Sequence, residues 1–225
     1  MWWLVGLRVS IAADLSALRP DAMADAICLQ TNRVRVMHGL PALKVRPMLH
    51  AGAQLHAEQM VDHDFFGHTA PAEADFTAPT DRMQAAGIAN PFPAENIATW
   101  YALKYYGTGY RTIDAERAIF RSEGRTLKAQ TPESFAVDIV AYWMSSPPHR
   151  ANLLSPYAIE IGCGSALYAN GGFPMVKGVQ LFQLHEPVTT DSGADDQGTL
   201  EGPGDGVGHQ PLQRQPEDGT PNRPP

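Results

Sequence analysis

Three residues far apart in the chain, His68, Glu95 and His149, have the side chains best suited to chemistry. Each lies next to a predicted turn or helix start, which would fix the direction of its side chain. Two neutral imidazoles and a carboxylate can hold a zinc ion and leave one position for water. A metal held in this way can activate the water or polarise a substrate carbonyl. The separations alone do not show that the three residues meet, because each also fits a solvated or structural role.

The segment that would position His149 is residues 141–156, AYWMSSPPHRANLLSP. Its apolar helical run meets two serines and two prolines, so one helix must end here and a second can begin. Pro147 and Pro148 suit the first turn of that second helix, and Ser146 can cap it. A dyad of Ser146 with His149 is the alternative, but no acid follows to orient the histidine. We therefore expect His149 at a rigid helix start, with Ser146 as its cap.

The remaining pattern predicts several helices around a small antiparallel sheet. In the first helix, Met23, Ile27, Val34 and Met37 would face the core. Further helices are predicted at residues 47–61, 82–88 and 131–144. Strands are predicted from about Glu95, at residues 158–163 and at residues 176–184, the last two joined through a turn at residues 170–172.

Composition divides the 225 residues into three parts around one predicted domain at residues 21–186. Residues 1–20 are predicted to be a flexible N-terminus or a weak export signal, with an apolar run too short to span a bilayer. Residues 187–225 contain seven glycines, seven prolines and no aromatic residue, with seven acidic and two basic side chains. We expect this acidic tail to be disordered. Neither part has the basic stripe that nucleic acid binding requires, so we expect no nucleic acid partner.

Two features of the domain leave alternatives open. Cys28 and Cys163 either form a disulfide, which would close a long loop, or remain buried free thiols. Residues 101–130 form a predicted insertion with a small hairpin that turns near Glu123 and Gly124. This insertion could line a binding cleft with aromatic and arginine side chains, or serve as a structural flap.

Eight segments occur in a characteristic order and spacing: residues 32–35, LHAGAQLHAEQM, FFGHT, DRMQAAGI, AENIA, WMSSPPHRANLLSP, IEIGCGSA and VQLF. Together they resemble the CAP superfamily, which includes cysteine-rich secretory proteins, antigen 5 and plant pathogenesis-related proteins. The similarity is to its short bacterial branch and covers roughly residues 24–184, apart from the insertion.

The resemblance implies an α+β fold, a three-layer α/β/α sandwich with a central antiparallel sheet and an open cleft. It places His68 and His149 as the two histidines of that cleft and Glu95 as its first acid, and His68 and His149 would hold a divalent cation such as Zn²⁺. Asn96 would anchor its loop. The second acid of the family is missing, because Ser146 stands where animal and plant members have a glutamate.

Three functions follow from this resemblance. The first is an exported binding protein, extracellular or periplasmic and not transmembrane, whose cleft engages a lipid, a cell-envelope component or another protein without an organic cofactor. The second is a zinc-dependent peptidase or esterase in which His68 and His149 hold the metal and Glu95 is the candidate base. The third is a structural envelope module with the acidic tail as a spacer.

Overall fold

The computed structural model describes residues 15–184 except residue 108. In this part of the chain five helices form, and each begins at a proline: α1 (Pro20–Met37), α2 (Pro47–Asp62), α3 (Pro79–Ala85), α4 (Pro132–Ser145) and α5 (Pro147–Leu153). Proline suits this position because it lacks an N–H that would be unpaired and its φ is already helical. The predicted acidic tail at 187–225 and most of the predicted N-terminal segment lie outside the described residues.

The central sheet has the strand order β1-β6-β7-β2. Its strands are β1 (Lys44–Val45), β2 (Pro93–Tyr101), β6 (Glu160–Asn170) and β7 (Phe173–Gln183). The predicted pairing of β6 with β7 is confirmed, and β2 is antiparallel to β7. The sheet is not wholly antiparallel, because the two-residue strand β1 pairs parallel to β6. β1 carries the chain along this edge of the sheet, between α1 on one face and α2 on the other.

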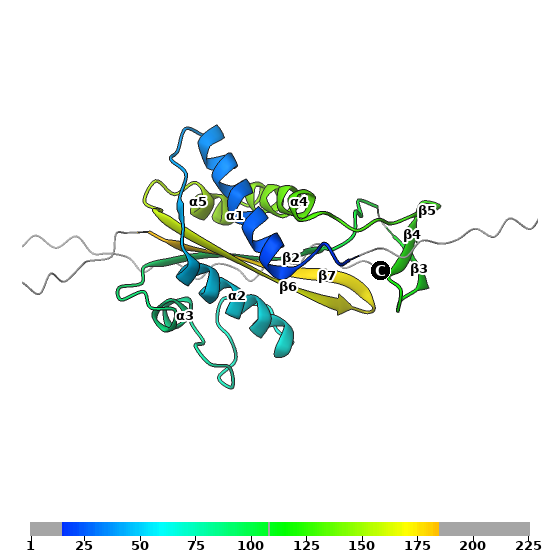
Figure 1. The fold of residues 1–225 in the computed structure, drawn as a ribbon, viewed down its shortest axis with the longest axis horizontal. Helices are drawn as coiled ribbons and strands as arrows, with labels where there is room; N and C mark the ends of the chain where they lie inside the picture. Colours follow the sequence, from blue (N-terminus) through cyan, green and yellow to red (C-terminus); the bar gives the residue numbers. More distant parts are fainter. Residues whose placement is uncertain (1–14, 108, 185–225) are drawn as a thin grey trace, which may run out of the picture.

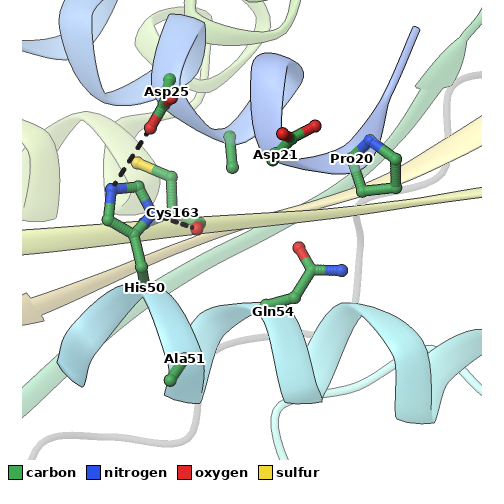
Figure 2. Close-up of a pocket in the computed structure, with 8 residues that line it drawn as sticks. Pro20, Asp21, Asp25, His50, Ala51, Gln54 and Cys163 are labelled. Atoms are coloured by element: carbon green, nitrogen blue, oxygen red, sulfur yellow. Dashed lines mark hydrogen bonds and ion pairs between the residues drawn. The ribbon is translucent and has the colours of Figure 1, made fainter. Parts of the chain in front are cut away.

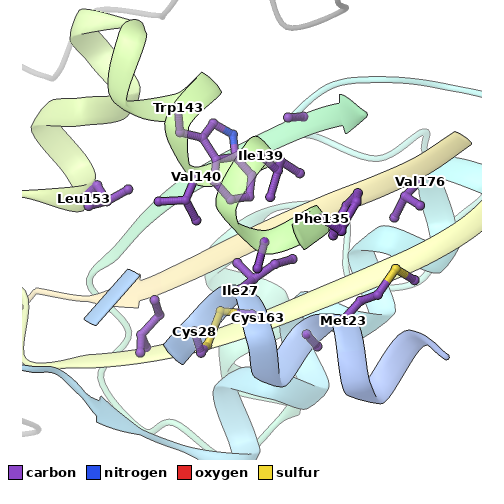
Figure 3. Packing of buried hydrophobic residues seen from close by; sticks show 14 of the residues in the cluster. Met23, Ile27, Cys28, Phe135, Ile139, Val140, Trp143, Leu153, Cys163 and Val176 are labelled. Atoms are coloured by element: carbon purple, nitrogen blue, oxygen red, sulfur yellow. A yellow bond between two sulfur atoms is a disulfide. The ribbon is translucent and has the colours of Figure 1, made fainter. Parts of the chain in front are cut away.

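Helices cover both faces of this sheet, which confirms the predicted three-layer sandwich (Figure 1). On one face, α1, α4 and α5 pack a core that includes Ile27, Phe135 and Trp143 (Figure 3). On the other face, α2 and α3 pack a second core that includes Leu49 and Met83. Each helix therefore presents one apolar side to the sheet, as its sequence periodicity indicates.

The open question about the cysteines is answered by a disulfide between Cys28 of α1 and Cys163 of β6. Both residues are buried in the core under α1 and α4 (Figure 3). The bond joins positions 135 residues apart, so it closes most of the domain into a loop.

Two glycines of β6 allow α2 to lie directly against the sheet. A Cβ at Gly162 would overlap the Leu49 carbonyl carbon, and one at Gly164 would overlap the Ala53 carbonyl carbon. Both neighbours are backbone atoms of a helix, which cannot turn aside as a flexible side chain would. The close approach of α2 to β6 therefore requires glycine at these positions.

Gly164→Ala should lower the free energy of unfolding by about 2–3 kcal/mol, because the helix must move away from the sheet. Chemical denaturation measures this loss. The control is Ala169→Val on the same strand, where the side chain is exposed and a change within about 0.5 kcal/mol is expected. Equal stability of the Gly164→Ala variant and the native chain would contradict the packing described above.

Two details of the predicted helices are wrong. Met37 is 82% exposed rather than facing the core, since α1 turns its stripe of Met23, Ile27 and Cys28 inward. The third helix begins at Pro79 rather than Arg82, and the Asp81 carboxylate accepts a hydrogen bond from the Ala78 N–H at 2.9 Å.

The predicted insertion contains a second sheet, in the order β3 (Arg111–Asp114), β4 (Ile119–Ser122) and β5 (Arg125–Thr126). The predicted turn at Glu123 and Gly124 is confirmed, and both residues have the positive φ that a two-residue hairpin turn favours. Phe120 of β4 packs on Phe173 of β7 and anchors this small sheet to one end of the central sheet.

Candidate functional site

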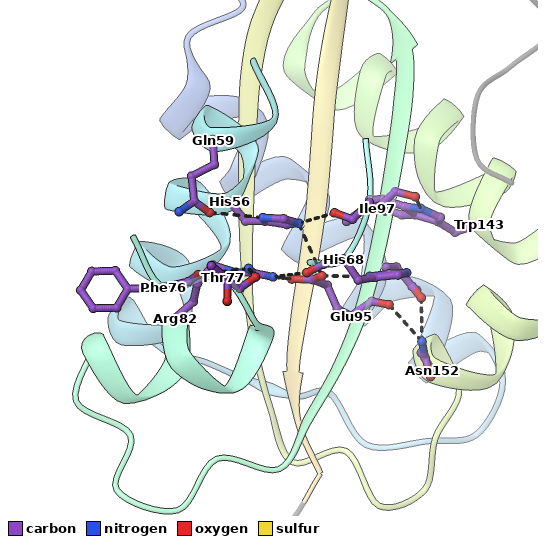
Figure 4. A network of polar contacts seen from close by, with 12 residues as sticks. His56, Gln59, His68, Phe76, Thr77, Arg82, Glu95, Ile97, Trp143 and Asn152 are labelled. Carbon is purple, nitrogen blue, oxygen red and sulfur yellow. Dashed lines mark hydrogen bonds and ion pairs between the residues drawn. The ribbon is translucent and has the colours of Figure 1, made fainter. Parts of the chain in front are cut away.

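Glu95 is buried near the start of β2, at the edge of the sheet, with both carboxylate oxygens occupied (Figure 4). The His68 Nδ1 lies 2.9 Å from Oε1, and the Arg82 Nη2 donates to Oε2 at 2.9 Å. Burial raises the pKa of the Glu95 carboxyl, but His56, the hydrogen bond from His68 and the Arg82 guanidinium together lower it from 4.5 to about 2. Glu95 is therefore an ionised carboxylate at neutral pH, paired inside the protein.

Arg82 is the residue that the sequence analysis missed and that makes this buried charge tolerable. Its guanidinium is buried and also donates to the backbone carbonyls of Thr77 and His68, at 2.8 and 3.0 Å. It thereby ties the loop before α3 to β2 as well as neutralising Glu95. No local signal in the sequence indicated this role, because Arg82 lies in the last turn of α3, where the helix dipole favours a basic side chain without any carboxylate.

His56 of α2 is a second residue that the sequence analysis missed. It is buried, its Nε2 lies 2.9 Å from the Gly67 carbonyl oxygen and 3.7 Å from Glu95 Oε1. Burial lowers the pKa of this imidazole, and the nearby Arg82 charge adds to that effect against the pull of Glu95. A neutral ring that donates to Gly67 holds the turn that presents His68. The signal for this role was its place within LHAGAQLHAEQM, on the buried side of a helix.

His68 is held by Glu95 in one orientation. Since a carboxylate can only accept, the Nδ1 carries the proton and the Nε2 is left as an acceptor or metal ligand. The side chain is 35% exposed, so this nitrogen can be reached from solvent. A carboxylate that accepts a hydrogen bond from one ring nitrogen commonly orients imidazoles whose other nitrogen binds a metal or takes part in catalysis.

His149 stands at the third position of α5 on the other side of the β2 edge. Its ring is buried, and its Nδ1 has no hydrogen-bond partner among the described residues. Burial, and then the charge of His68, lower the pKa of His149. A buried nitrogen without a partner costs roughly 1–3 kcal/mol, and the Nε of Arg82 is a second such atom in this cluster.

Asn96 fixes α5 to the sheet. Its amide donates to the His149 carbonyl at 3.0 Å and to the Gln180 side chain at 2.9 Å. Its oxygen accepts from Asn152, which also donates to the Glu95 carbonyl (Figure 4). This chain of amides couples the position of His149 to that of Glu95 through neighbouring residues of β2.

Ser146 occupies the cap position of α5, but the expected cap hydrogen bond is not formed by its side chain. Pro147 and Pro148 fill the first two helical positions and have no N–H to offer. Among residues 15–107 and 109–184, no hydrogen bond joins Ser146 to His149 either, so the two do not form a dyad here.

The arrangement defines what the site can do chemically. Glu95 is suited to orienting His68, because a carboxylate with pKa about 2 has little tendency to take a proton at neutral pH. Within the described part of the chain, no group of three or more His, Cys, Asp or Glu side chains has the geometry of a metal site. The groups left for chemistry are therefore two imidazoles, the partly exposed His68 and the buried His149.

These buried histidines should make stability depend on pH. The unfolded chain takes up protons near the ordinary histidine pKa of 6.5, whereas burial lowers the pKa of His56 and His149 in the folded state. The unfolded state therefore binds more protons below pH 6.5, and the free energy of unfolding should fall as pH is lowered from 7 to 5.

Urea denaturation between pH 7 and pH 5 measures this slope, which should flatten in a His56→Gln, His149→Gln variant. His63→Gln, at an exposed position after α2, should keep the native slope. A native slope in the double variant would show that the buried histidines do not cause the acid sensitivity.

The other edge of the sheet holds a separate pocket of about 460 Å³ between α1 and α2 (Figure 2). Here His50 contacts the Cys163 carbonyl at 2.8 Å, and Gln54 both donates to and accepts from the Ser165 backbone. These side chains take the place of a strand beyond the end of β1. His50 therefore protects the edge of β6 through its contacts with the Cys163 backbone.

Comparison with known proteins agrees with this geometry. Residues 30–182 match the model of CAP, the cysteine-rich secretory protein family, and the chain belongs to this family. It is 28% identical over 134 residues to the uncharacterized protein YkwD of Bacillus subtilis (strain 168), an alignment that covers 60% of this chain and 38% of YkwD.

Solved structures resemble the fold. An extracellular protein containing an SCP domain from Bacillus anthracis str. Ames matches with a TM-score of 0.50 and 22% identity, over 73% of this chain and 41% of that one. An outer surface protein from Borrelia burgdorferi matches with a TM-score of 0.48 and 15% identity, over 74% of this chain and 94% of that one. The chain spans less than half the length of YkwD and of the Bacillus anthracis protein.

Within residues 15–184, residue 108 apart, no helix is both long enough and apolar enough to span a bilayer.

Proposed function

We propose that this chain is an exported binding protein whose recognition point is the pair His68 and His149. The observation that carries the proposal is the buried Nδ1 of His149, which has no hydrogen-bond partner among the described residues. A ligand that reaches this point gains a hydrogen bond or a metal–nitrogen bond that the free protein cannot make. The ligand class is a component of the cell envelope, whether lipid or protein.

A divalent cation such as Zn²⁺ fits the same pair. His68 has its Nε2 free and its Nδ1 fixed by a carboxylate, and His149 offers a neutral imidazole nitrogen. Glu95 would not be a ligand, since both its oxygens are engaged. When bound, the ion would supply open coordination positions for an oxygen or nitrogen of the ligand, and the chain's own residues would fix its place.

Export is supported by chemistry within the chain. The Cys28–Cys163 disulfide persists in oxidising compartments and is rare in the reducing cytosol. The family to which the chain belongs is described as secretory, and the Bacillus anthracis protein is described as extracellular. We infer an extracellular or periplasmic location.

Titration calorimetry with zinc chloride tests the metal part of the proposal. The native chain should bind the ion, His68→Ala and His149→Ala should lose binding, and His63→Ala should keep it because this exposed histidine is not part of the pair. Binding that survives both site variants would remove the metal from the proposal.

Retention on isolated bacterial envelopes tests the ligand part. The native chain should sediment with the envelopes, and His149→Ala should stay in the supernatant while remaining folded by circular dichroism. Equal sedimentation of the native chain and the His149→Ala variant would refute the His68–His149 pair as the recognition point.

A further inference from the structure

The insertion differs in charge from the rest of the chain. Residues 101–130 contain six of the 17 Lys and Arg residues but only three of the 24 Asp and Glu residues. The insertion is thus positively charged in a chain of net charge −7. A concentration of positive charge in one segment of an acidic chain indicates an anionic partner for that segment, rather than a role of the charge in solubility.

The small sheet places two of these cations directly opposite each other. Arg111 of β3 and Arg121 of β4 are partners in register, so their side chains emerge on the same face. Like charges in this position are destabilising. The neighbouring pair, Thr112 and Phe120, faces the other way, and Phe120 is buried against Phe173. The packing of Phe120 on the inner face therefore fixes the register of the two strands. As a consequence, the guanidinium groups of Arg111 and Arg121 must lie together on the outer face.

No carboxylate of the described residues neutralises this pair. Arg111 makes no ion pair or hydrogen bond through its side chain within residues 15–184 without 108. Arg121 donates only to the Gly124 carbonyl, and its Nε is buried without a partner. Arg117, by contrast, pairs with Asp114 at 3.7 Å. The Arg111–Arg121 pair thus has unused N–H donors and uncompensated charge.

A groove of about 560 Å³ lies over this pair. Its lining includes Tyr110, Arg111, Ile113, Arg121, Ser122 and Glu123. The guanidinium groups offer paired donors that match a carboxylate or phosphate, and the Glu123 carboxylate offers acceptors for hydroxyl groups. The half-buried ring of Tyr110 and the exposed side chain of Ile113 add apolar surface.

We propose that this groove binds an acidic saccharide, with Arg111 and Arg121 on its carboxylate. Glu123 distinguishes this ligand from a polyphosphate or nucleic acid, whose closely spaced charges it would repel. The acidic remainder of the chain also opposes an extended polyanionic surface such as an anionic membrane. A saccharide with one carboxylate per sugar fits isolated cations beside hydroxyl acceptors. This site is independent of the His68–His149 pair, so either proposal can fail alone.

Titration of the full chain with a trimer of α-linked galacturonic acid tests the proposal. The native chain should bind the trimer, and Arg111→Gln should weaken binding about tenfold through loss of a charged bidentate contact. The control Arg117→Gln removes the same charge from the insertion, outside the groove, and should bind as the native chain does. The thermal midpoint of each variant reports whether it is folded.

The remaining probes separate the ligand classes. The methyl ester of the trimer, inorganic phosphate and phosphatidylglycerol vesicles should each bind at least about tenfold more weakly than the free acid. Binding of the ester as strong as that of the acid, preference for phosphate or vesicles, or an equal loss in Arg117→Gln would overturn the proposal, as would absence of binding by the native chain.

Discussion

Replacing both Cys28 and Cys163 with alanine should lower the free energy of unfolding by roughly 4–5 kcal/mol, the largest effect that we expect from a local change. The disulfide joins positions 135 residues apart, so without it the unfolded chain gains the conformational freedom of nearly the whole domain. It also links α1 to β6 inside the core, where two separate alanines would leave a small void. Chemical denaturation of the oxidised native chain and the double variant measures the difference.

Reducing agent provides the matched control for this prediction. It should destabilise the native chain toward the double variant and leave the double variant unchanged. A native chain whose denaturation midpoint is the same with and without reductant would show that the bond does not contribute to stability.

Arg82→Met should cost about 3–5 kcal/mol at pH 7, because it leaves the Glu95 carboxylate buried without its permanent countercharge. His56 also remains next to Glu95, but burial favours the neutral form of its imidazole, which carries no full charge. Without the Arg82 guanidinium the pKa of Glu95 should rise from about 2, because one of the interactions that offset the effect of burial is lost. The loss of stability caused by Arg82→Met, measured by chemical denaturation, should therefore differ between pH 7 and pH 4.5.

The sign of this pH dependence separates the charge effect from lost packing. In the Arg82→Met variant, Glu95 can become neutral on acidification, so the penalty relative to the native chain should shrink at pH 4.5. Adding Glu95→Gln to Arg82→Met should recover part of the lost stability at pH 7. A penalty that is the same at both pH values and in the double variant would mean that Arg82 acts only through its volume and its backbone hydrogen bonds.

The sequence predicted the local features well because local rules govern them. Proline residues mark the starts of α2, α4 and α5, and the apolar stripe of α2 follows from a repeat of three to four residues. The hairpin turn at Glu123 and Gly124 follows from turn chemistry. Met37 shows the limit of such rules, because the choice of buried stripe on α1 depends on what the helix packs against.

Among the candidate site residues, the structure joins His68 directly to Glu95 and ties His149 to β2 through the hydrogen bond that its carbonyl accepts from Asn96. Arg82 and His56 belong to the same cluster, although nothing in the spacing of the sequence links them to Glu95. Glu95 resembles an exposed acid at a strand start, and it is instead the buried centre of this cluster.

The sequence alone determined where the helices begin, where the chain turns and which family-like segments follow one another, since each of these depends on a few neighbouring residues. The tertiary structure decided which charges meet, which cysteines bond and which nitrogen is left without a partner. Those outcomes depend on contacts between residues tens of positions apart, whose desolvation and pairing energies exist only once the layers have packed.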